Sequence, residues 1–154
     1  RVDSDEVTYN LHIILRYELE RDLFGGKLNI KDLPEAWNAK VKEYLGLDVP
    51  DDKRGVLQDV HWSGGNFGYF PAYTLGNLYA AQIWSKVRKD IGQIPMSAGL
   101  VPYLYKIREW LKEKIHRFGA TYEAVDLLKM ITGEKLNPQY FSDYINQKFE
   151  NLYV

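Results

Sequence analysis

The sequence predicts an all-α protein. Apolar residues recur at the three- and four-residue spacing of helices through most of the chain, and residues typical of helix ends separate these segments. The alternation of apolar and polar residues that marks half-buried strands is almost absent. A length of 154 residues suits one compact domain or a large piece of a larger one.

The first predicted helix is capped by Asp3 or Ser4 and is stopped by Gly25-Gly26. Acidic residues in its first turn favour the positive end of the helix dipole. The apolar residues at helical spacing are Val7, Leu11, Ile14, Leu15 and Leu19. These signals predict a helix with one buried face.

The second predicted helix begins at Asp32, Pro34 and Glu35, which resemble a capping box with proline in the first turn. It ends near Gly46. Residues 48–66 follow as a long loop, rich in glycine and acidic residues, with room for a short helix or strand. The remaining predicted helices span residues 71–91, 101–118, 121–133 and 137–152.

Two of these later helices have distinct end signals. Gly92 is a C-cap for the first of them. Asn137 is an N-cap for the last, and Pro138 occupies its first position, where a missing N–H group costs nothing.

Charge and composition exclude several classes of function. Twenty Lys and Arg against 21 Asp and Glu leave a net charge of −1, which does not drive binding to nucleic acid or to an anionic membrane. No run of about 18 apolar residues is present, and residues 1–6 lack the apolar core of a signal peptide. The absence of cysteine excludes disulfides and thiolate metal sites, and it fits a cytoplasmic protein.

The segment 55–73 holds the residues most typical of a functional site. Its glycines at positions 64, 65 and 68 allow positive φ angles and close approach of the backbone to another surface. His61 and several aromatic residues lie among them, and imidazole and phenol groups are good donors to a developing oxyanion. The alternative is an aromatic loop buried against a neighbouring helix, with His61 bonded to a backbone carbonyl.

Two further groups of polar residues precede this segment. Arg1 lies just before a helix, and a guanidinium there suits recognition of a peptide's terminal carboxylate; pairing with Asp3 or Asp5 at the surface is the alternative. His12 and Arg16 share a helix face with Glu20, whereas Glu18 lies off this row. One histidine and one glutamate do not make a zinc site, so this row is interpreted as a structural polar seam.

Together these residues resemble the carboxypeptidase Taq family of zinc metallopeptidases. The family pattern Gly-x-x-Gln-Asp-x-His-Trp is complete at Gly55, Gln58, Asp59, His61 and Trp62. The pattern Ile-Arg-x-x-Ala-Asp is altered: Arg1 and Asp5 match, and Ser4 replaces alanine. Further resemblance covers nearly the whole chain, in residues 5–12, 16–20, 67–76 and 133–141.

The resemblance implies a multi-helix fragment of a larger, mostly helical zinc metallopeptidase fold. Residues 1–154 would be the C-terminal segment of a catalytic domain that removes single amino acids from peptide C-termini. In this family two histidines of a His-Glu-x-x-His helix and a later glutamate hold the zinc, and the glutamate within the motif activates water. The chain lacks that motif, so no metal ligand is expected in it and the isolated chain is expected to be inactive.

The resemblance also implies roles for single residues. Arg1 would bind the terminal carboxylate of the substrate, and His61 would hold the substrate or stabilise the tetrahedral intermediate. Tyr73, with Tyr69 as the second choice, would donate a hydrogen bond to the same oxyanion.

Three more residues of the motif receive substrate-binding roles. Gln58 and Asp59 would orient the loop, in part by fixing the tautomer of His61. Trp62 is grouped with them as a substrate-binding residue.

The partners implied are peptide substrates, the N-terminal part of the same enzyme and a second copy in a homodimer. A rival hypothesis is a non-catalytic helical module that binds a peptide or protein through aromatic contacts. Upstream sequence encoding His-Glu-x-x-His would favour the enzyme, and translation starting near Arg1 would favour the module. A third possibility is a fragment produced by proteolysis or partial ordering, and the lack of an initial methionine predicts truncation.

Overall fold

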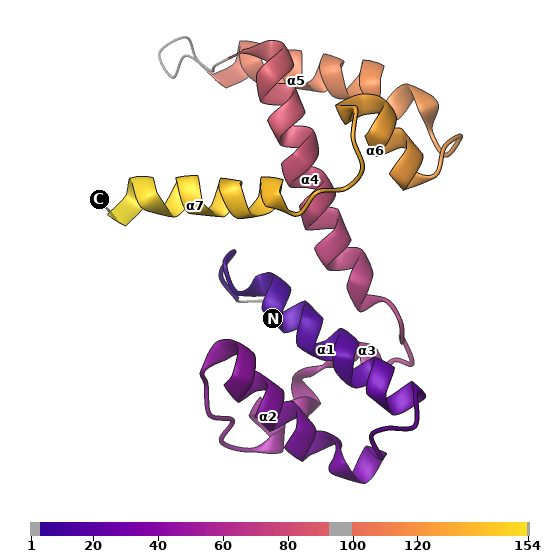
Figure 1. Cartoon of the computed structure of the whole chain (residues 1–154), viewed down its shortest axis with the longest axis vertical. Coiled ribbons are helices and arrows are strands. Elements are labelled where there is room, and N and C mark those ends of the chain that lie inside the picture. Colours follow the sequence, from indigo (N-terminus) through magenta and orange to yellow (C-terminus); the bar gives the residue numbers. More distant parts are fainter. Residues whose placement is uncertain (1–3, 93–99, 154) are drawn as a thin grey trace. The chain divides into compact units, whose positions relative to one another are not determined.

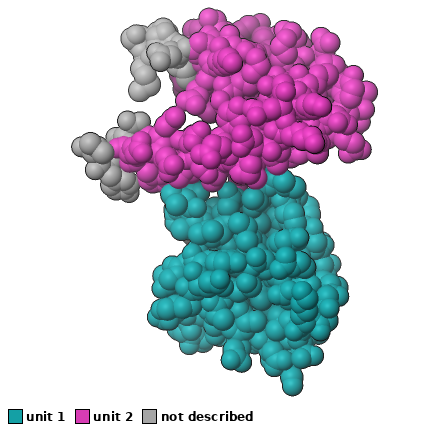
Figure 2. All heavy atoms as spheres, viewed as in Figure 1, with its two compact units in different colours: residues 1–75 teal, residues 76–154 magenta. Residues whose placement is uncertain are grey.

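The all-α prediction is confirmed. The computed structural model describes residues 4–92 and 100–153, and this part of the chain consists of helices joined by loops, without a β-strand (Figure 1). The expectations for Arg1 and Asp3 fall outside the described residues. The chain divides into two compact units, residues 1–75 and 76–154 (Figure 2).

Unit 1 is built from two long helices and a series of short ones. Its elements are α1 (Tyr9–Phe24), η1 (Ile30–Asp32), α2 (Leu33–Leu45), η2 (Asp52–Arg54), η3 (Val56–Gln58), α3 (Val60–Ser63) and the first turn and a half of α4 (Phe70–Ile91). The predicted loop of residues 48–66 therefore contains three short helical turns. No described helix combines the length and the apolar character that crossing a bilayer requires.

The first helix begins later than predicted, at Tyr9 rather than after Ser4. The reason is Asp5, whose Oδ1 accepts hydrogen bonds from the backbone N–H groups of Val7 and Thr8, both at 2.9 Å. Its Oδ2 accepts a third from the Thr8 hydroxyl at 2.8 Å. The carboxylate expected inside the first helical turn thus caps a separate turn ahead of it.

The second helix has the predicted proline in its first turn and ends before Gly46, which takes the left-handed conformation with φ 70°. Its predicted capping box does not form. Asp32 bonds no helix N–H group, because its Oδ2 accepts from Asn29 Nδ2 at 3.1 Å instead.

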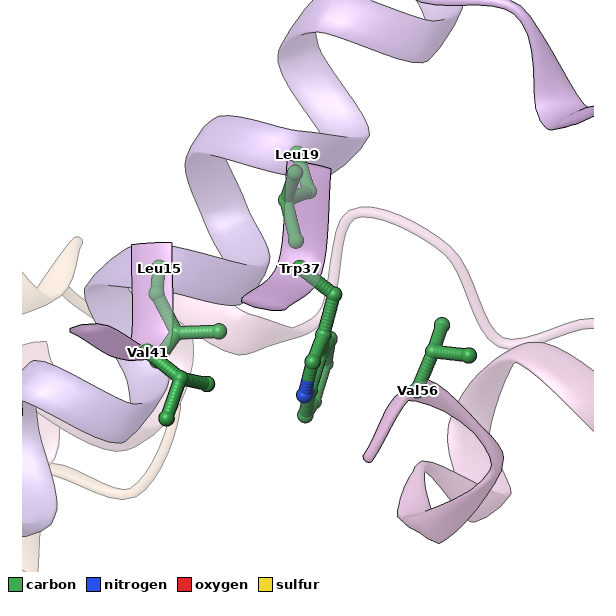
Figure 3. Close-up of a cluster of buried hydrophobic side chains, with 5 residues drawn as sticks. All are labelled: Leu15, Leu19, Trp37, Val41 and Val56. Atoms are coloured by element: carbon green, nitrogen blue, oxygen red, sulfur yellow. The ribbon is translucent and has the colours of Figure 1, made fainter. Parts of the chain in front are cut away.

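The core of unit 1 lies where α1 packs against α2 and η3. Its buried side chains are Leu15, Leu19, Trp37, Val41 and Val56 (Figure 3). The buried face of α1 also carries Arg16 and Glu20, whereas Val7 and Ile14, which were expected on it, are exposed. Charged groups on a buried face require partners, and these partners define the site described below.

Unit 2 contains the rest of α4, α5 (Leu100–Lys114), η5 (His116–Phe118), α6 (Ala124–Thr132) and α7 (Gln139–Tyr153). The helix predicted over 101–118 is therefore two elements, which separate at Ile115. The predicted glycine cap is confirmed: Gly92 has φ 86°, and its N–H donates to Arg88 O at 3.0 Å. Asn137 is the predicted N-cap, since its Oδ1 accepts from the backbone N–H of Gln139 at 3.0 Å.

The buried side chain of Gln82 connects α4 to the turn between α6 and α7. Gln82 Nε2 donates to Thr132 Oγ1 at 3.2 Å and to Lys135 O at 3.1 Å. Its Oε1 accepts from the backbone N–H of Asn137 at 2.9 Å. This side chain therefore satisfies three polar groups of a turn about fifty residues away in sequence.

Candidate functional site

The imidazole of His61 is carried by α3, a helix of four residues. Asp59 is its N-cap: Oδ1 accepts from the backbone N–H groups of His61 at 2.8 Å and Trp62 at 3.3 Å. These bonds satisfy two of the N–H groups that a helix start leaves without partners. Asp59 thus holds the backbone of the turn that carries His61.

The other oxygen of Asp59 binds Arg16 on α1. Arg16 Nε lies 2.6 Å from Asp59 Oδ2, and the two side chains are only 3% and 1% exposed. Arg16 Nη1 also donates to the backbone carbonyl of His12 at 2.6 Å, and the guanidinium lies 4.6 Å from the centroid of the Trp37 ring. The charge of the buried carboxylate is therefore balanced by a cation that is itself held from two sides.

His61 and Tyr73 meet across the glycine-rich segment. His61 Nε2 lies 3.0 Å from Tyr73 Oη. The imidazole is surrounded by three aromatic rings, with centroid distances of 4.9 Å to Phe70, 5.8 Å to Tyr73 and 6.3 Å to Tyr69. Tyr69 itself is 53% exposed. His61 and Tyr73, which the family resemblance assigns to an oxyanion, thus form one cluster with the second-choice Tyr69.

The surroundings of Nδ1 favour one tautomer of His61. Nδ1 is buried, has no hydrogen-bond partner within bonding geometry, and lies 3.5 Å from Asp59 Oδ1. A lone pair on Nδ1 would face a carboxylate, whereas an N–H there is attracted to it, so we assign the proton to Nδ1. Nε2 then accepts the hydroxyl proton of Tyr73.

This arrangement offers hydrogen-bond donors to an anion in two ways. The Tyr73 hydroxyl can turn its proton from Nε2 to a bound oxyanion, and a protonated His61 can donate from Nε2 itself. The His61 side chain is 11% exposed, so a small part of the imidazole faces solvent.

The remaining predicted residues lie apart from this pair. Trp62 points inward: its indole Nε1 donates to Glu20 Oε1 at 2.8 Å, and its ring packs edge-on against Trp37 with centroids 5.8 Å apart. Gln58 is exposed, and its Nε2 donates to Lys53 O at 2.5 Å within its own loop. Arg1 falls outside the described residues.

A cavity of about 330 Å³ opens on the side of α1 that carries His12 and Arg16, with Trp37, Val41 and Leu45 among its lining residues. His12 is partly buried there. Burial lowers the pKa of His12 from 6.5 to about 4, and the nearby charge of Arg16 contributes to this decrease. His12 is therefore neutral at physiological pH.

His12, Arg16 and Glu20 were predicted from the sequence to form a polar seam on the first helix, but the residues that bind this seam were not predicted. The four-residue spacing was the available signal, since it places all three on one face of α1. Asp59, the partner of Arg16, and Trp62, a partner of Glu20, lie more than forty residues further along the chain.

No group of three or more histidine, aspartate or glutamate side chains with metal-binding geometry occurs in residues 4–92 and 100–153. A protein zinc site usually needs three such ligands.

The comparisons with known proteins agree with the helical fold. The family model for carboxypeptidase Taq (M32) metallopeptidases matches residues 1–149. Carboxypeptidase 1 of Bacillus subtilis is 45% identical over 154 residues, and thermostable carboxypeptidase 1 of Thermus thermophilus is 47% identical over 156. The crystal structure of an M32 carboxypeptidase from Deinococcus radiodurans superposes with a TM-score of 0.88 at 37% identity, covering 99% of this chain.

These matches are to a family of metallopeptidases, and the chain belongs to this carboxypeptidase Taq (M32) family. The two curated relatives are matched over 100% and 99% of this chain but only 30% of their own length. The chain also covers 31% of the Deinococcus structure. The chain thus spans about 30% of the proteins that it resembles.

Proposed function

We propose that residues 1–154 are the C-terminal segment of the catalytic domain of a zinc metallocarboxypeptidase, which releases single amino acids from peptide C-termini. Family membership and the names of the matched relatives support the reaction class. The proposal includes a cytoplasmic location, a homodimeric enzyme and zinc ligands in polypeptide outside these residues. The isolated segment is then inactive.

The observation that carries the proposal is the contact of His61 Nε2 with Tyr73 Oη at 3.0 Å. Peptide hydrolysis develops negative charge on the carbonyl oxygen, and donors already in place stabilise that charge more than the ground state. The chemistry that zinc supplies when bound is activation of the attacking water. Tyr73 donates a hydrogen bond to the developing oxyanion, and His61 donates a second from Nε2 when the imidazole is protonated.

Asp59 supports this pair by holding the turn of His61, and Arg1 binds the terminal carboxylate of the peptide. A guanidinium suits that task because it offers two parallel N–H groups to the two carboxylate oxygens. Tyr69 is the alternative donor, since its ring contacts Tyr73 edge-on at 5.2 Å between centroids.

The test uses the full-length zinc enzyme with a short peptide substrate. Tyr73→Phe and His61→Ala are each expected to lower kcat roughly 100-fold while changing KM little, because each removes a donor used mainly in the transition state. Arg1→Ala is expected to raise KM. Tyr122→Phe is the control, since Tyr122 is exposed and packs on Phe118 in unit 2. Unchanged kcat in both site variants would contradict the assignment.

A further inference from the structure

We infer that Glu20 is a positioning residue for the His61–Tyr73 pair. Its carboxylate on α1 holds both ends of the glycine-rich segment, residues 62–68, which joins α3 to α4. The catalytic consequence rests on the proposed function, whereas the positioning itself rests on contacts within this chain.

The two oxygens of Glu20 bind the two ends of the segment. Oε1 accepts from Trp62 Nε1 at 2.8 Å, and Oε2 accepts from the backbone N–H of Gly68 at 2.9 Å. Glu20 is only 4% exposed, and no cation of the described residues pairs with it. These two N–H groups therefore compensate a charge that has lost its water.

The two residues that bind Glu20, Trp62 and Gly68, lie next to the elements that carry His61 and Tyr73. Trp62 directly follows His61 in α3. Gly68 lies two residues before α4, whose first turn carries Tyr73. One carboxylate thus fixes the residue next to the imidazole and the entrance of the helix that carries the phenol.

The segment between these ends is held only in part by its own contacts: Gly65 N–H donates to Trp62 O at 3.1 Å, and the Phe67 ring packs on Phe24 of α1 at 5.1 Å between centroids. Residues 63–69 are exposed, and Gly65 and Gly68 have φ angles of 74° and 73°. Glycine reaches many conformations besides this one, so further anchors at the ends of the segment reduce its conformational freedom. Phe70 supplies an apolar one, since its buried ring packs against His61 and Trp62. Apolar packing is non-directional, and the hydrogen bonds to Glu20 set which atoms are held.

Glu18 provides a matched control on the same helix. It has the same side chain, lies two residues earlier, and binds α2 instead of the glycine-rich segment. Its Oε2 accepts from Lys40 Nζ and from Tyr44 Oη, both at 2.6 Å. Substitution of either glutamate would weaken α1 in general, whereas only substitution of Glu20 would remove the hydrogen bonds to Trp62 and Gly68.

The first experiment compares Glu20→Gln and Glu18→Gln in the 154-residue chain by NMR. A glutamine at position 20 keeps one acceptor oxygen, so one of the two N–H groups loses its partner. We expect hydrogen exchange of the Trp62 indole or the Gly68 amide to accelerate at least tenfold, and the cross-peaks between the His61 and Tyr73 rings to weaken. Glu18→Gln is expected to leave both observations as in the wild type.

A second variant covers the case in which Glu20→Gln does not fold. Trp62→Phe keeps an aromatic ring in the core but removes the indole donor together with part of the ring volume, and it too should weaken the ring cross-peaks. Wild-type cross-peaks in folded Glu20→Gln, or in folded Trp62→Phe where Glu20→Gln does not fold, would overturn the inference.

The catalytic consequence has its own readout in the full-length enzyme. Glu20→Gln should lower kcat at least tenfold with little change in KM, and Glu18→Gln should change neither. If the wild-type enzyme does not hydrolyse peptides, the proposed function fails, while the NMR comparison still decides whether Glu20 holds the pair. Loosened rings in NMR with an unchanged kcat would overturn the catalytic part alone.

Discussion

The guanidinium of Arg16 and the carboxylate of Asp59 meet at 2.6 Å, although 43 residues separate them in sequence. Asp59 uses its second oxygen to cap the helix that carries His61. The ion pair therefore connects α1 to the imidazole through a single side chain. A buried ion pair adds little net stability compared with an apolar contact, but removing one member leaves a buried charge without a partner.

Asp59→Asn should lower the free energy of unfolding by about 3–5 kcal/mol, because Arg16 remains buried without its counter-charge. Asparagine keeps a capping oxygen, so the loss reports mainly on the ion pair. Urea denaturation measures it. Asp48→Asn is the control: Asp48 pairs with Lys42 at 2.9 Å on the surface, and such pairs contribute about 0–1 kcal/mol. A loss below about 1 kcal/mol for Asp59→Asn would show that Arg16 finds another partner.

Gly68→Ala should destabilise the chain by about 1–2 kcal/mol, because position 68 has φ 73° and side chains with a Cβ rarely adopt that conformation. Nothing lies within 4 Å of the added Cβ, so the cost is backbone strain alone. Gly76→Ala, inside α4 with equally open space and no such φ angle, should stabilise by about 0.5–1 kcal/mol. Thermal unfolding of the two variants should shift in opposite directions, and shifts of the same sign would contradict this account.

Gln82→Leu should destabilise the chain by about 2–4 kcal/mol, since it leaves the Asn137 N–H group and the Lys135 carbonyl without their partner. Chemical denaturation provides the measurement. Gln139→Leu changes the same chemistry at an exposed position, where the amide bonds only Asp143, and should alter stability by less than about 0.5 kcal/mol. Equal effects of the two substitutions would mean that the buried bonds of Gln82 are replaced by water.

Acidification from pH 6.5 to pH 5 should destabilise the chain through His12. Its folded pKa of about 4 lies below the ordinary 6.5, so in this window the unfolded chain takes up a proton that the folded chain does not. The stability contributed by His12 is thus complete above about pH 6.5 and is lost as the pH falls. His12→Gln should remove this slope in urea midpoints measured across the window. An identical slope in both proteins would assign the effect to another group.

Much of the helical framework was predictable because short-range signals fix it. Gly46, Gly92 and Gly133 end three helices in the left-handed conformation that glycine adopts without strain, and the sequence predicted an end near each of them. The start of α1 was not predictable in the same way. Asp5 has both backbone and hydroxyl donors within reach, and it stabilises a separate turn instead of the first helical turn.

The candidate site was less predictable because its contacts are long-range. Helical spacing placed Arg16 and Glu20 on one face of α1, but nothing local indicates that they bind Asp59 and Gly68, which lie 43 and 48 residues away respectively. The roles of His61 and Tyr73 came from the family pattern rather than from spacing. The inward turn of Trp62 depends on a core that only the folded chain provides.

The four-residue helix that carries His61 is far shorter than any helix that persists alone in water. Its ordering therefore depends on contacts with α1, made through Asp59 and through Trp62. Local opening of α1 should release the imidazole in the same event, so the two belong to one cooperative unit of unfolding. The protection of the His61 amide against hydrogen exchange then measures the free energy of local opening of α1.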